Sequence, residues 1–449
     1  MSQKSFTIQI RNKIKPYNKI IEVDSDKSLS IRSFLIGSLC QNISTVTNVL
    51  ESEDVKSTIK ACKKLGVKIH KLNTGSYKIY GKGLGSLFAK KNTIIDCSNS
   101  GTAARLLLGI LSTTPNIEII MTGDNSLRKR SMKELVQLLS KFGATFLPKN
   151  KFNFPLKIIS SDMPVGINYS AGVSAQLKSA VILAGLNSYG NTKITENIKS
   201  RDHTENLLKK NTNAININYG KEKIIEVYGK RSLEHFRLNI SGDPSSSAFF
   251  SALTLLNKNS SLKIKNVGLN PTRTGFYKLL KKYNAKIKFA NIKKYNNELR
   301  GDVLVKSSKL KPITSPGYFY PSTADEYPIL FVLAGLTKGI SVFKNLGDLF
   351  NKESNRVKEM QKVLKQVGIK TISTKSELKI YGKGIIDASN KTITIQKGIH
   401  DHRIHMASFV LSLLTGSATN LKGFETVFTS SPSFLKIMKS LGASFEIKK

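Results

Sequence analysis

The sequence predicts a two-domain α/β protein built from six copies of one helix–strand–helix–strand unit. Two observations carry this prediction. The chain has 449 residues, 40% of them hydrophobic, which is enough for a large core and long for one domain. One pattern also recurs along it: a polar segment, an amphipathic helix ending near Gly or Ala, and a short alternating strand.

One landmark residue follows the amphipathic helix of each copy. The landmarks are Gly66, Gly143, Ala214, Ala285, Gly368 and Gly442. Glycine at four of these six positions suits the left-handed backbone at which many helices end. We therefore expect each amphipathic helix to turn there into its strand.

A second, more apolar helix with a polar start precedes each amphipathic helix. The segments are "KSLSIRSFLIGSL", "SGTAARLLLGIL", "VSAQLKSAVILAGL", "DPSSSAFFSALTLL", "TADEYPILFVLAGL" and "DHRIHMASFVLSLL". Ser, Thr and Asp stand where N-caps belong. Helices that are apolar on most faces are expected to be buried.

Six units are too many for one core, so we expect three in each of two domains. The copy that opens near Gly242 begins the second half. One domain is then 25–242, and the other is 1–24 plus 243–449. The N-terminal strand is expected to pair with the second half, since chain ends often lie close together.

The net charge is strongly positive, with 71 Lys and Arg against 30 Asp and Glu. The lysines are spread over the whole length beside abundant Ile and Asn. This favours drift in composition together with a small anionic substrate over a nucleic-acid footprint. A basic nucleic-acid-binding protein remains an alternative, although Trp is absent and most Phe and Tyr fall in apolar patterns rather than on stacking platforms.

The cysteines point to a reducing compartment. Cys40, Cys62 and Cys97 are odd in number and lie in or beside apolar segments, which predicts buried thiols rather than disulfides. The N-terminus offers no apolar core for a signal, and runs such as "YPILFVLAGL" are too short to cross a membrane. We expect a soluble, cytoplasmic protein.

The segment "NSGTAARLLLGIL" raises the question of what its polar helix start is for. The free N–H groups at a helix start bind anions, and Gly101 lets a ligand approach the backbone closely. Asn99 and Thr102 can both cap and donate. Taken alone, this segment is better explained as an ordinary N-cap with a short turn.

Basic residues near other helix starts strengthen the anion hypothesis. Ser28 and Arg32 share one face at a spacing of four, next to Lys27. Further basic residues of this kind are Arg130, Lys352, Arg356 and Arg403. Arginine holds carboxylates and phosphates bidentately, although each of these residues alone is better explained as a surface charge. His400, His402 and His405 suggest a metal site, but no Cys or further carboxylate cluster completes a ligand set. We therefore favour roles in capping a helix or lining a cleft.

Seven motifs, in order, carry a family resemblance from about residue 20 to the C-terminus. They are "SAQLKSAVILAGL", "RDHTE", "GDPSSSAF", "NPTRTG", "DEYPIL", "KESNR" and "DHRIHM". Together they resemble the enolpyruvyl transferases, and among them the class II branch of the 5-enolpyruvylshikimate-3-phosphate (EPSP) synthase family. The resemblance implies an inverted αβ barrel of two domains, each of three βαβαββ repeats, with the active site in the interdomain cleft.

The resemblance also implies a reaction of the shikimate pathway, which supplies chorismate and the aromatic amino acids. The enolpyruvyl group of phosphoenolpyruvate is transferred to the 5-hydroxyl of shikimate 3-phosphate, and inorganic phosphate leaves. Both substrates are anions, so cationic preorganisation and exclusion of water are expected to carry much of the catalysis. We expect no cofactor, no metal, no specific nucleic acid and no membrane as a partner, and the fold and the repeats suggest a monomer.

Site residues carry over from the family by motif. Asp325 resembles the base at the 5-hydroxyl, Glu353 the acid and base at the methylene carbon, and Lys27 a bridge between both substrates. The residues implied for shikimate 3-phosphate are Lys27, Ser28, Arg32, Ser174, Ala175, Gln176, Arg201, Asp325 and Lys352. Those implied for phosphoenolpyruvate are Lys27, Gly101, Arg130, Gln176, Arg356 and Arg403. Without the resemblance, a helix cap would be the favoured reading of Asp325.

The sequence departs from the family pattern at several positions. Asn355 stands where the family usually has Asp, which puts the support of Arg356 in question. Ser131 replaces a usual Pro beside Arg130. A lysine of the class I branch is absent from "FTSSPSF", which leaves more of the phosphate to Arg403. A glyphosate-tolerant form of the family carries Ala at the position of Gly101, so Gly101 argues against tolerance.

Other enzymes of related architecture fit less well. The sister transferase that acts on UDP-N-acetylglucosamine uses a reactive Cys in its first domain, and no Cys lies between Gly109 and Met132. The RNA 3′-phosphate cyclases rely on a nucleophilic His.

Overall fold

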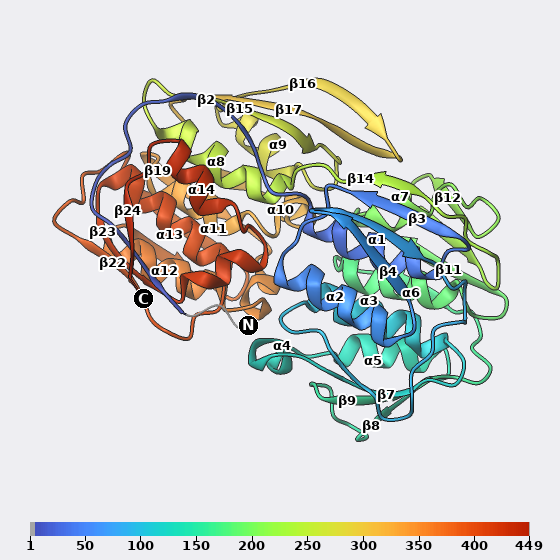
Figure 1. The fold of residues 1–449 in the computed structure, drawn as a ribbon. Helices are drawn as coiled ribbons and strands as arrows, with labels where there is room; N and C mark the ends of the chain where they lie inside the picture. The colour runs from blue at the N-terminus through green and yellow to red at the C-terminus, as the bar shows by residue number, and fades with distance from the viewer. Residues whose placement is uncertain (1–4, 449) are drawn as a thin grey trace. The chain divides into compact units, whose positions relative to one another are not determined.

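The computed structural model describes residues 5–448, which fold into two compact units (Figure 1). Unit 1 comprises Met1–Asp24, Ser241–Lys294 and Leu299–Lys449, and unit 2 comprises Ser25–Ile240 and Tyr295–Glu298. Ser241 and Gly242 therefore belong to unit 1 and Tyr295–Glu298 to unit 2, and at these positions the units differ from the expected division. In the described part of the chain, no helix has the length and apolar character needed to span a bilayer.

Unit 2 contains three successive repeats of alternating helices and strands. The first holds α1 (Lys27–Leu39), β3 (Ile43–Thr47), α2 (Glu53–Lys64), β4 (Lys68–Asn73) and β5 (Ser76–Tyr80). The second holds β6 (Ile94–Asp96), α3 (Gly101–Thr113), β7 (Glu118–Thr122), α4 (Asn125–Lys129), α5 (Lys133–Ser140), β8 (Thr145–Leu147) and β9 (Leu156–Ile159). The third holds β10 (Asn168–Ala171), α6 (Ala175–Gly185), β11 (Asn191–Glu196), α7 (His203–Leu208), β12 (Ile215–Tyr219) and β13 (Lys223–Tyr228), and β14 (Arg237–Asn239) follows.

Unit 1 repeats the same order of elements. It begins with β1 (Thr7–Ile10) and β2 (Asn18–Glu22) and continues with α8 (Pro244–Leu256), β15 (Ser261–Gly268), α9 (Gly275–Lys282), β16 (Lys286–Tyr295) and β17 (Glu298–Lys306). Next come β18 (Thr314–Ser315), α10 (Tyr320–Thr323), α11 (Tyr327–Gly335), β19 (Gly339–Phe343), α12 (Arg356–Gln366), β20 (Lys370–Ser373) and β21 (Leu378–Gly382). The last repeat holds β22 (Thr392–Ile395), α13 (His402–Thr415), β23 (Ala418–Lys422), α14 (Phe434–Ser440) and β24 (Phe445–Lys448).

Within residues 5–448, the strands form six four-stranded sheets with one common topology. In the sheet β6-β7-β9-β8, for example, β6 and β7 are parallel, whereas β9 is antiparallel to both of its neighbours. The mixed α/β architecture predicted from the sequence is confirmed. Strand pairing within residues 5–448 gives separate sheets and no closed barrel.

Strands from distant parts of the chain complete three of the sheets. β1 pairs antiparallel with β23 and β24, and β2 pairs in parallel with β15. In unit 2, β14 pairs in parallel with β3. The N-terminal strands thus join two sheets whose other strands come from the second half of the sequence.

The apolar helices form the interior of each unit, with the sheets outside them (Figure 1). Every residue of α8, α11 and α13 is buried. Such helices have no solvated face, so the backbone groups left free at their two ends need partners within the protein.

The N-terminal ends are closed mostly by capping side chains. Asp26, Ser100, Ser174, Asp243 and Asp401 each accept a hydrogen bond from a backbone N–H at the start of α1, α3, α6, α8 and α13. These are the caps that the polar helix starts predicted. The exception is α11, which begins at Tyr327 after Glu326, without a side-chain cap and with Pro near its start.

The C-terminal ends are closed by the last strand of the same repeat. After that strand, a backbone N–H donates to a carbonyl oxygen at the end of the buried helix. The pairs are Lys82 to Ser38, Ser161 to Ser112, Lys230 to Leu186, Ser308 to Leu255 and Lys383 to Gly335, over 2.8 to 3.1 Å. This backbone contact recurs in five of the repeats and satisfies carbonyl groups that the helix itself leaves free.

Glycine permits this close approach in three repeats. A Cβ on Gly81, Gly229 or Gly382 would overlap the carbonyl oxygen of Cys40, Ser188 or Thr337, respectively. At the landmark positions, glycine is needed for its backbone conformation rather than for space. Gly66, Gly143, Gly368 and Gly442 have positive φ. In the fourth copy, Asn284, one residue before Ala285, has the positive φ instead, at 69°.

The three cysteines are free and buried, as predicted. Burial raises the pKa of Cys40 to about 12 and that of Cys62 to about 11, and burial followed by the neighbouring Asp96 raises the pKa of Cys97. All three are therefore protonated thiols at neutral pH.

We expect Gly81→Ala to destabilise the protein by about 1–3 kcal/mol, because the added methyl group meets backbone rather than a movable side chain. Gly172→Ala in the same unit is the control, since a Cβ there has no neighbour within 4 Å. Urea unfolding measures both. Equal stabilities would contradict the close approach.

We also expect native protein at pH 8 to be almost unreactive toward a thiol-specific reagent, whereas unfolded protein exposes all three thiols. A raised pKa leaves only a trace of thiolate below pH 9, and burial denies access to the reagent. Titration of thiols with and without denaturant tests this. One rapidly reacting thiol in the native protein would be the contrary result.

Candidate active site

The residues implicated by the sequence fall into two groups, one in each unit. In unit 2 they lie at or near the starts of α1, α3, α6 and α7, and in unit 1 at or near the starts of α11, α12 and α13. Each group is built on the ends of helices, where backbone donors are free.

The start of α3 brings a glycine and two guanidinium groups together. A Cβ on Gly101 would lie 2.8 Å from Arg130 Nη1 and 3.2 Å from Arg105 Nη1. Arg130 Nη2 donates to Asn99 Oδ1 over 3.0 Å. Two cations beside a helix N-terminus make a site suited to an anionic group, and any side chain at Gly101 would intrude on it.

Gln176 links the starts of α6 and α3. Its Oε1 accepts from Arg105 Nη1 over 2.6 Å, and its Nε2 donates to Thr102 Oγ1 over 3.0 Å. The preceding Ala175 is the first residue of α6, and Ser174 caps that helix through Leu177 N–H. Arg105 thus belongs to this group, although the sequence argument gave it no role.

The start of α1 carries Lys27, Ser28 and Arg32. Lys27 Nζ lies 2.9 Å from Asp54 Oδ2. Arg32 is 3% exposed, and its Nη1 donates to the Ser28 carbonyl over 3.2 Å. Arg201, in the segment between β11 and α7, is half-buried. The expected pairing of Ser28 and Arg32 on one helix face is present.

In unit 1, one buried arginine holds three carboxylates. Arg356 begins α12 and is 1% exposed. Its Nε lies 3.0 Å from Asp401 Oδ2 and its Nη1 3.5 Å from Asp325 Oδ1, and Nη2 is bonded to Glu353 Oε2. Burial disfavours the charge, but Asp401, Glu353 and Asp325 outweigh it and raise the pKa of Arg356.

Asp325 does not cap a helix. It lies in the turn between α10 and α11, while Glu326 occupies the N-cap position of α11. Instead, Arg356 brings the Asp325 and Glu353 carboxylates, the two proposed acid–base groups, to one guanidinium.

Arg403, in the first turn of α13, is tied to the same cluster through Asp401. Asp401 Oδ1 accepts from the Arg403 backbone N–H over 3.0 Å while Oδ2 holds Arg356. The Arg403 guanidinium lies over the Phe249 ring, and its Nε and Nη1 are buried without a hydrogen-bond partner among residues 5–448. Buried guanidinium donors without partners are suited to a carboxylate or phosphate.

The two residues that depart from the family pattern, Asn355 and Ser131, each make a local hydrogen bond. Asn355 caps α12 by accepting from Lys358 N–H over 3.0 Å, and Arg356 is supported by carboxylates rather than by Asn355. Ser131 Oγ accepts from Lys133 N–H over 3.2 Å. Lys352 Nζ is paired with Asp348, whose carboxylate also accepts from Tyr320.

The histidine cluster is explained by local structure. Both ring nitrogens of buried His405 lie 3.0 Å from backbone carbonyl oxygens, of Asp401 and Lys422. Within the described residues, no group of three or more His, Cys, Asp or Glu is placed to hold a metal ion.

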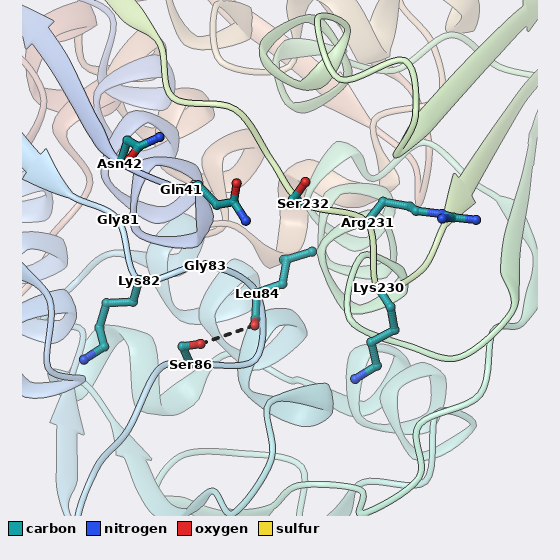
Figure 2. A pocket seen from close by; sticks show the side chains of 10 residues that line it. All are labelled: Gln41, Asn42, Gly81, Lys82, Gly83, Leu84, Ser86, Lys230, Arg231 and Ser232. Atoms are coloured by element: carbon teal, nitrogen blue, oxygen red, sulfur yellow. Dashed lines mark hydrogen bonds between the residues drawn. The ribbon is translucent and has the colours of Figure 1, made fainter.

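A pocket of about 560 Å³ in unit 2 contains none of the implicated residues. Figure 2 shows its lining, drawn from segments 41–42, 81–86 and 230–232. Lys82 and Lys230 donate the backbone N–H groups that close the C-terminal ends of α1 and α6, where a helix dipole favours cations. The basic lining therefore has a structural cause, and this end of a helix is unfavourable for anions.

Comparisons with known proteins agree with the motifs. A family model described as "EPSP synthase (3-phosphoshikimate 1-carboxyvinyltransferase)" matches residues 11–438. A protein of Paramagnetospirillum magneticum named 3-phosphoshikimate 1-carboxyvinyltransferase is 36% identical over 424 residues, 94% of each chain. A protein of the same name from Thermodesulfovibrio yellowstonii is 38% identical over 96% of this chain and 99% of its own.

Solved structures show the same fold. EPSP synthase from Acinetobacter baumannii superposes with a TM-score of 0.84 and 32% identity, over 99% of this chain and 100% of that one. The enolpyruvyl transferase NikO from Streptomyces tendae has a TM-score of 0.77 at 12% identity, over 99% of both chains, which is a likeness of fold alone.

We expect Arg356→Met to lower the free energy of unfolding by about 3–5 kcal/mol, because it leaves three carboxylates, one of them fully buried, without their shared cation. Lys362→Met, on the same helix, is the control, since its pair with Glu359 is exposed, and we expect a change within about 0.5 kcal/mol. Denaturant unfolding measures both. Similar losses for the two variants would show that Arg356 is not the anchor of the cluster.

Proposed function

Because this chain belongs to the EPSP synthase family, we propose that the two groups of residues described above bind its substrates and move its protons. The protein is an enolpyruvyl transferase, a 3-phosphoshikimate 1-carboxyvinyltransferase of the shikimate pathway. It transfers the enolpyruvyl group of phosphoenolpyruvate to the 5-hydroxyl of shikimate 3-phosphate and releases inorganic phosphate.

Shikimate 3-phosphate is bound mainly by the unit 2 group in this proposal. Arg32 and Arg201 bind its anionic groups, with Ser28, Ser174, Ala175 and Gln176 as the hydrogen-bonding frame. Lys27 contacts both substrates, and Lys352 and Asp325 contact shikimate 3-phosphate from unit 1. The basic helix starts and the nearly complete burial of Arg32 support this assignment.

Phosphoenolpyruvate is bound by Arg130 and Gly101 at the start of α3, by Lys27 and Gln176, and by Arg356 and Arg403. The single observation that carries the proposal is the cluster in which Asp325 and Glu353 share Arg356, next to Arg403 with its buried, unpartnered donors. It supplies two carboxylates for proton transfer and one cation for an anionic substrate.

We assign the two proton transfers to these carboxylates, as the family resemblance implies. The 5-hydroxyl oxygen of shikimate 3-phosphate attacks C2 of phosphoenolpyruvate while Asp325 accepts the hydroxyl proton. Glu353 donates a proton to the methylene carbon. In the second step, Glu353 takes a proton back from the methyl group as phosphate leaves, and the proton held by Asp325 departs with the phosphate. The surrounding cations stabilise the phosphorylated tetrahedral intermediate.

The alternative substrate UDP-N-acetylglucosamine is disfavoured by the thiols, since Cys40, Cys62 and Cys97 are all buried and their pKa values are raised. A nucleic-acid-binding role has no specific observation in its favour. We further propose a cytoplasmic monomer whose domains are 1–24 plus 243–449 and 25–242. Free thiols support the compartment, and light scattering tests the monomer.

The test is inorganic phosphate release from phosphoenolpyruvate, with and without shikimate 3-phosphate, by wild type, Asp325→Asn and Glu353→Gln. We expect release only when both substrates are present, and a fall in kcat of about 10²–10⁴-fold in either variant, since each removes one proton-transfer group. UDP-N-acetylglucosamine in place of shikimate 3-phosphate is expected to give no release.

Asp387→Asn provides the matched control, because Asp387 is an exposed carboxylate of unit 1 paired with Lys13. It is expected to keep wild-type kcat. Unchanged kcat in Asp325→Asn would remove the assigned base. A folded wild type that releases no phosphate would overturn the proposed roles of both groups.

A further inference from the structure

Unit 2 contains a buried cluster of two lysines and two glutamates that the proposed reaction does not use. Lys178 Nζ lies 2.6 Å from Glu196 Oε1 and 2.8 Å from Glu205 Oε1. Lys223 Nζ lies 2.9 Å from Glu205 Oε1 and 3.2 Å from Glu196 Oε2. We call these four residues the buried quartet.

The quartet is almost completely removed from water. The side chains of Lys178 and Glu196 are 0% exposed, and those of Glu205 and Lys223 are 1% and 5% exposed. Burial opposes the charged form of Glu205, but Lys178 and Lys223 outweigh it and lower its pKa to about 2. The short ion pairs among the four side chains tie together the elements that carry them: α6, β11, α7 and β13.

Two members of the quartet are chain neighbours of the residues that hold Arg32. Arg32 Nε donates to Thr204 Oγ1 over 2.8 Å, and its Nη2 donates to Ser179 Oγ over 3.2 Å. Thr204 Oγ1 in turn donates to Ser179 Oγ over 2.8 Å. Ser179 follows Lys178 on α6, and Thr204 precedes Glu205 on α7, so the ion pair between Lys178 and Glu205 fixes the spacing of both hydroxyl groups around the guanidinium.

A third member holds the segment before Arg201. Glu196 Oε1 accepts from the backbone N–H and the hydroxyl of Ser200, over 2.9 and 2.7 Å. Ser200 is 1% exposed and directly precedes Arg201. The same carboxylate oxygen that pairs with Lys178 therefore anchors the backbone from which Arg201 extends.

We infer that the buried quartet consists of positioning residues, which set Arg32 and Arg201 for the anionic groups of shikimate 3-phosphate. This inference rests on the proposed function, in which these two arginines bind that substrate. Because guanidinium recognition of an anion depends on direction as well as charge, a shift of α6 against α7 weakens binding without removing either arginine.

The test must change the quartet without leaving an unpaired buried charge. Lys178→Met together with Glu205→Gln removes one cation and one anion, so the remaining Lys223 and Glu196 still balance each other. The pair of exposed Lys71 and half-buried Glu51 in the same unit, 2.7 Å apart, gives the control double variant Lys71→Met with Glu51→Gln, in which the glutamine oxygen can still accept from Gly75 N–H and Tyr77.

In the quartet double variant, we expect the KM for shikimate 3-phosphate to rise by about tenfold or more, as for the loss of a charge-assisted hydrogen bond. We expect the KM for phosphoenolpyruvate to change by less than about threefold, and the surface control to match wild type in both constants. A quartet that serves stability alone would lower the unfolding midpoint and leave both constants unchanged, which would overturn the inference.

A second measurement does not depend on activity. The Arg32 Nε–H signal in a ¹⁵N–¹H spectrum, assigned by its absence in Arg32→Lys, reports the bond to Thr204. We expect it to shift and to exchange faster with water in the quartet double variant of the substrate-free protein. An unchanged signal would contradict positioning through Thr204.

Glu205→Asp keeps all four charges but shortens one side chain, so it covers the case in which the double variant does not fold. We expect a smaller rise of the KM for shikimate 3-phosphate in the same direction, and no rise would count against the inference. Arg32→Lys separates the two proposals. If it leaves the KM for shikimate 3-phosphate unchanged, the role of Arg32 fails, whereas a large rise there with no effect in the quartet variants defeats only the positioning role.

Discussion

A helix that is buried on every face still has free N–H groups at one end and free C=O groups at the other, and both need partners inside the protein. This constraint governs each repeat of the chain. Side chains such as Asp26 and Ser100 close the N-terminal ends of buried helices, and a backbone N–H after the returning strand closes the C-terminal ends. These backbone hydrogen bonds hold each sheet to its buried helix at an end that water does not reach.

Because of this constraint, the two ends of the buried helices serve different purposes. The C-terminal ends are occupied by backbone from the same repeat, as Lys82 N–H occupies the end of α1. At the N-terminal ends, a capping side chain satisfies only part of the free backbone N–H groups, so donors remain there. These ends also carry the arginines and carboxylates of the proposed site. Arg356 and Arg32 are held there by buried partners, Asp401 for one and Ser179 with Thr204 for the other, so binding costs little reorganisation.

The sequence predicts features that depend on one residue and its near neighbours. The repeat, the buried thiols and the caps at Ser100 and Asp243 are of this kind, because each leaves a local pattern. The closure of the helix C-termini does not, since Gly81–Lys82 and Ser160–Ser161 make the same backbone contact with unrelated side chains. Contacts such as Arg105 to Gln176 join segments far apart in the chain and leave no local pattern. Asp325 could be taken for a helix cap in the sequence, but α11 begins two residues later, at Tyr327.

Most of the non-glycine residues with positive φ are Asn, among them Asn42, Asn116, Asn284 and Asn345. Asparagine adopts this conformation more readily than other side chains do, so the turns between helices and strands offer it a natural place. Exposed strand faces accept lysine, as at Lys68 and Lys370, and strand interiors accept isoleucine. Turns and outer strand faces can therefore take up Asn and Lys without disturbing the buried helix ends, so a formal net charge of +41 does not by itself require an anionic ligand.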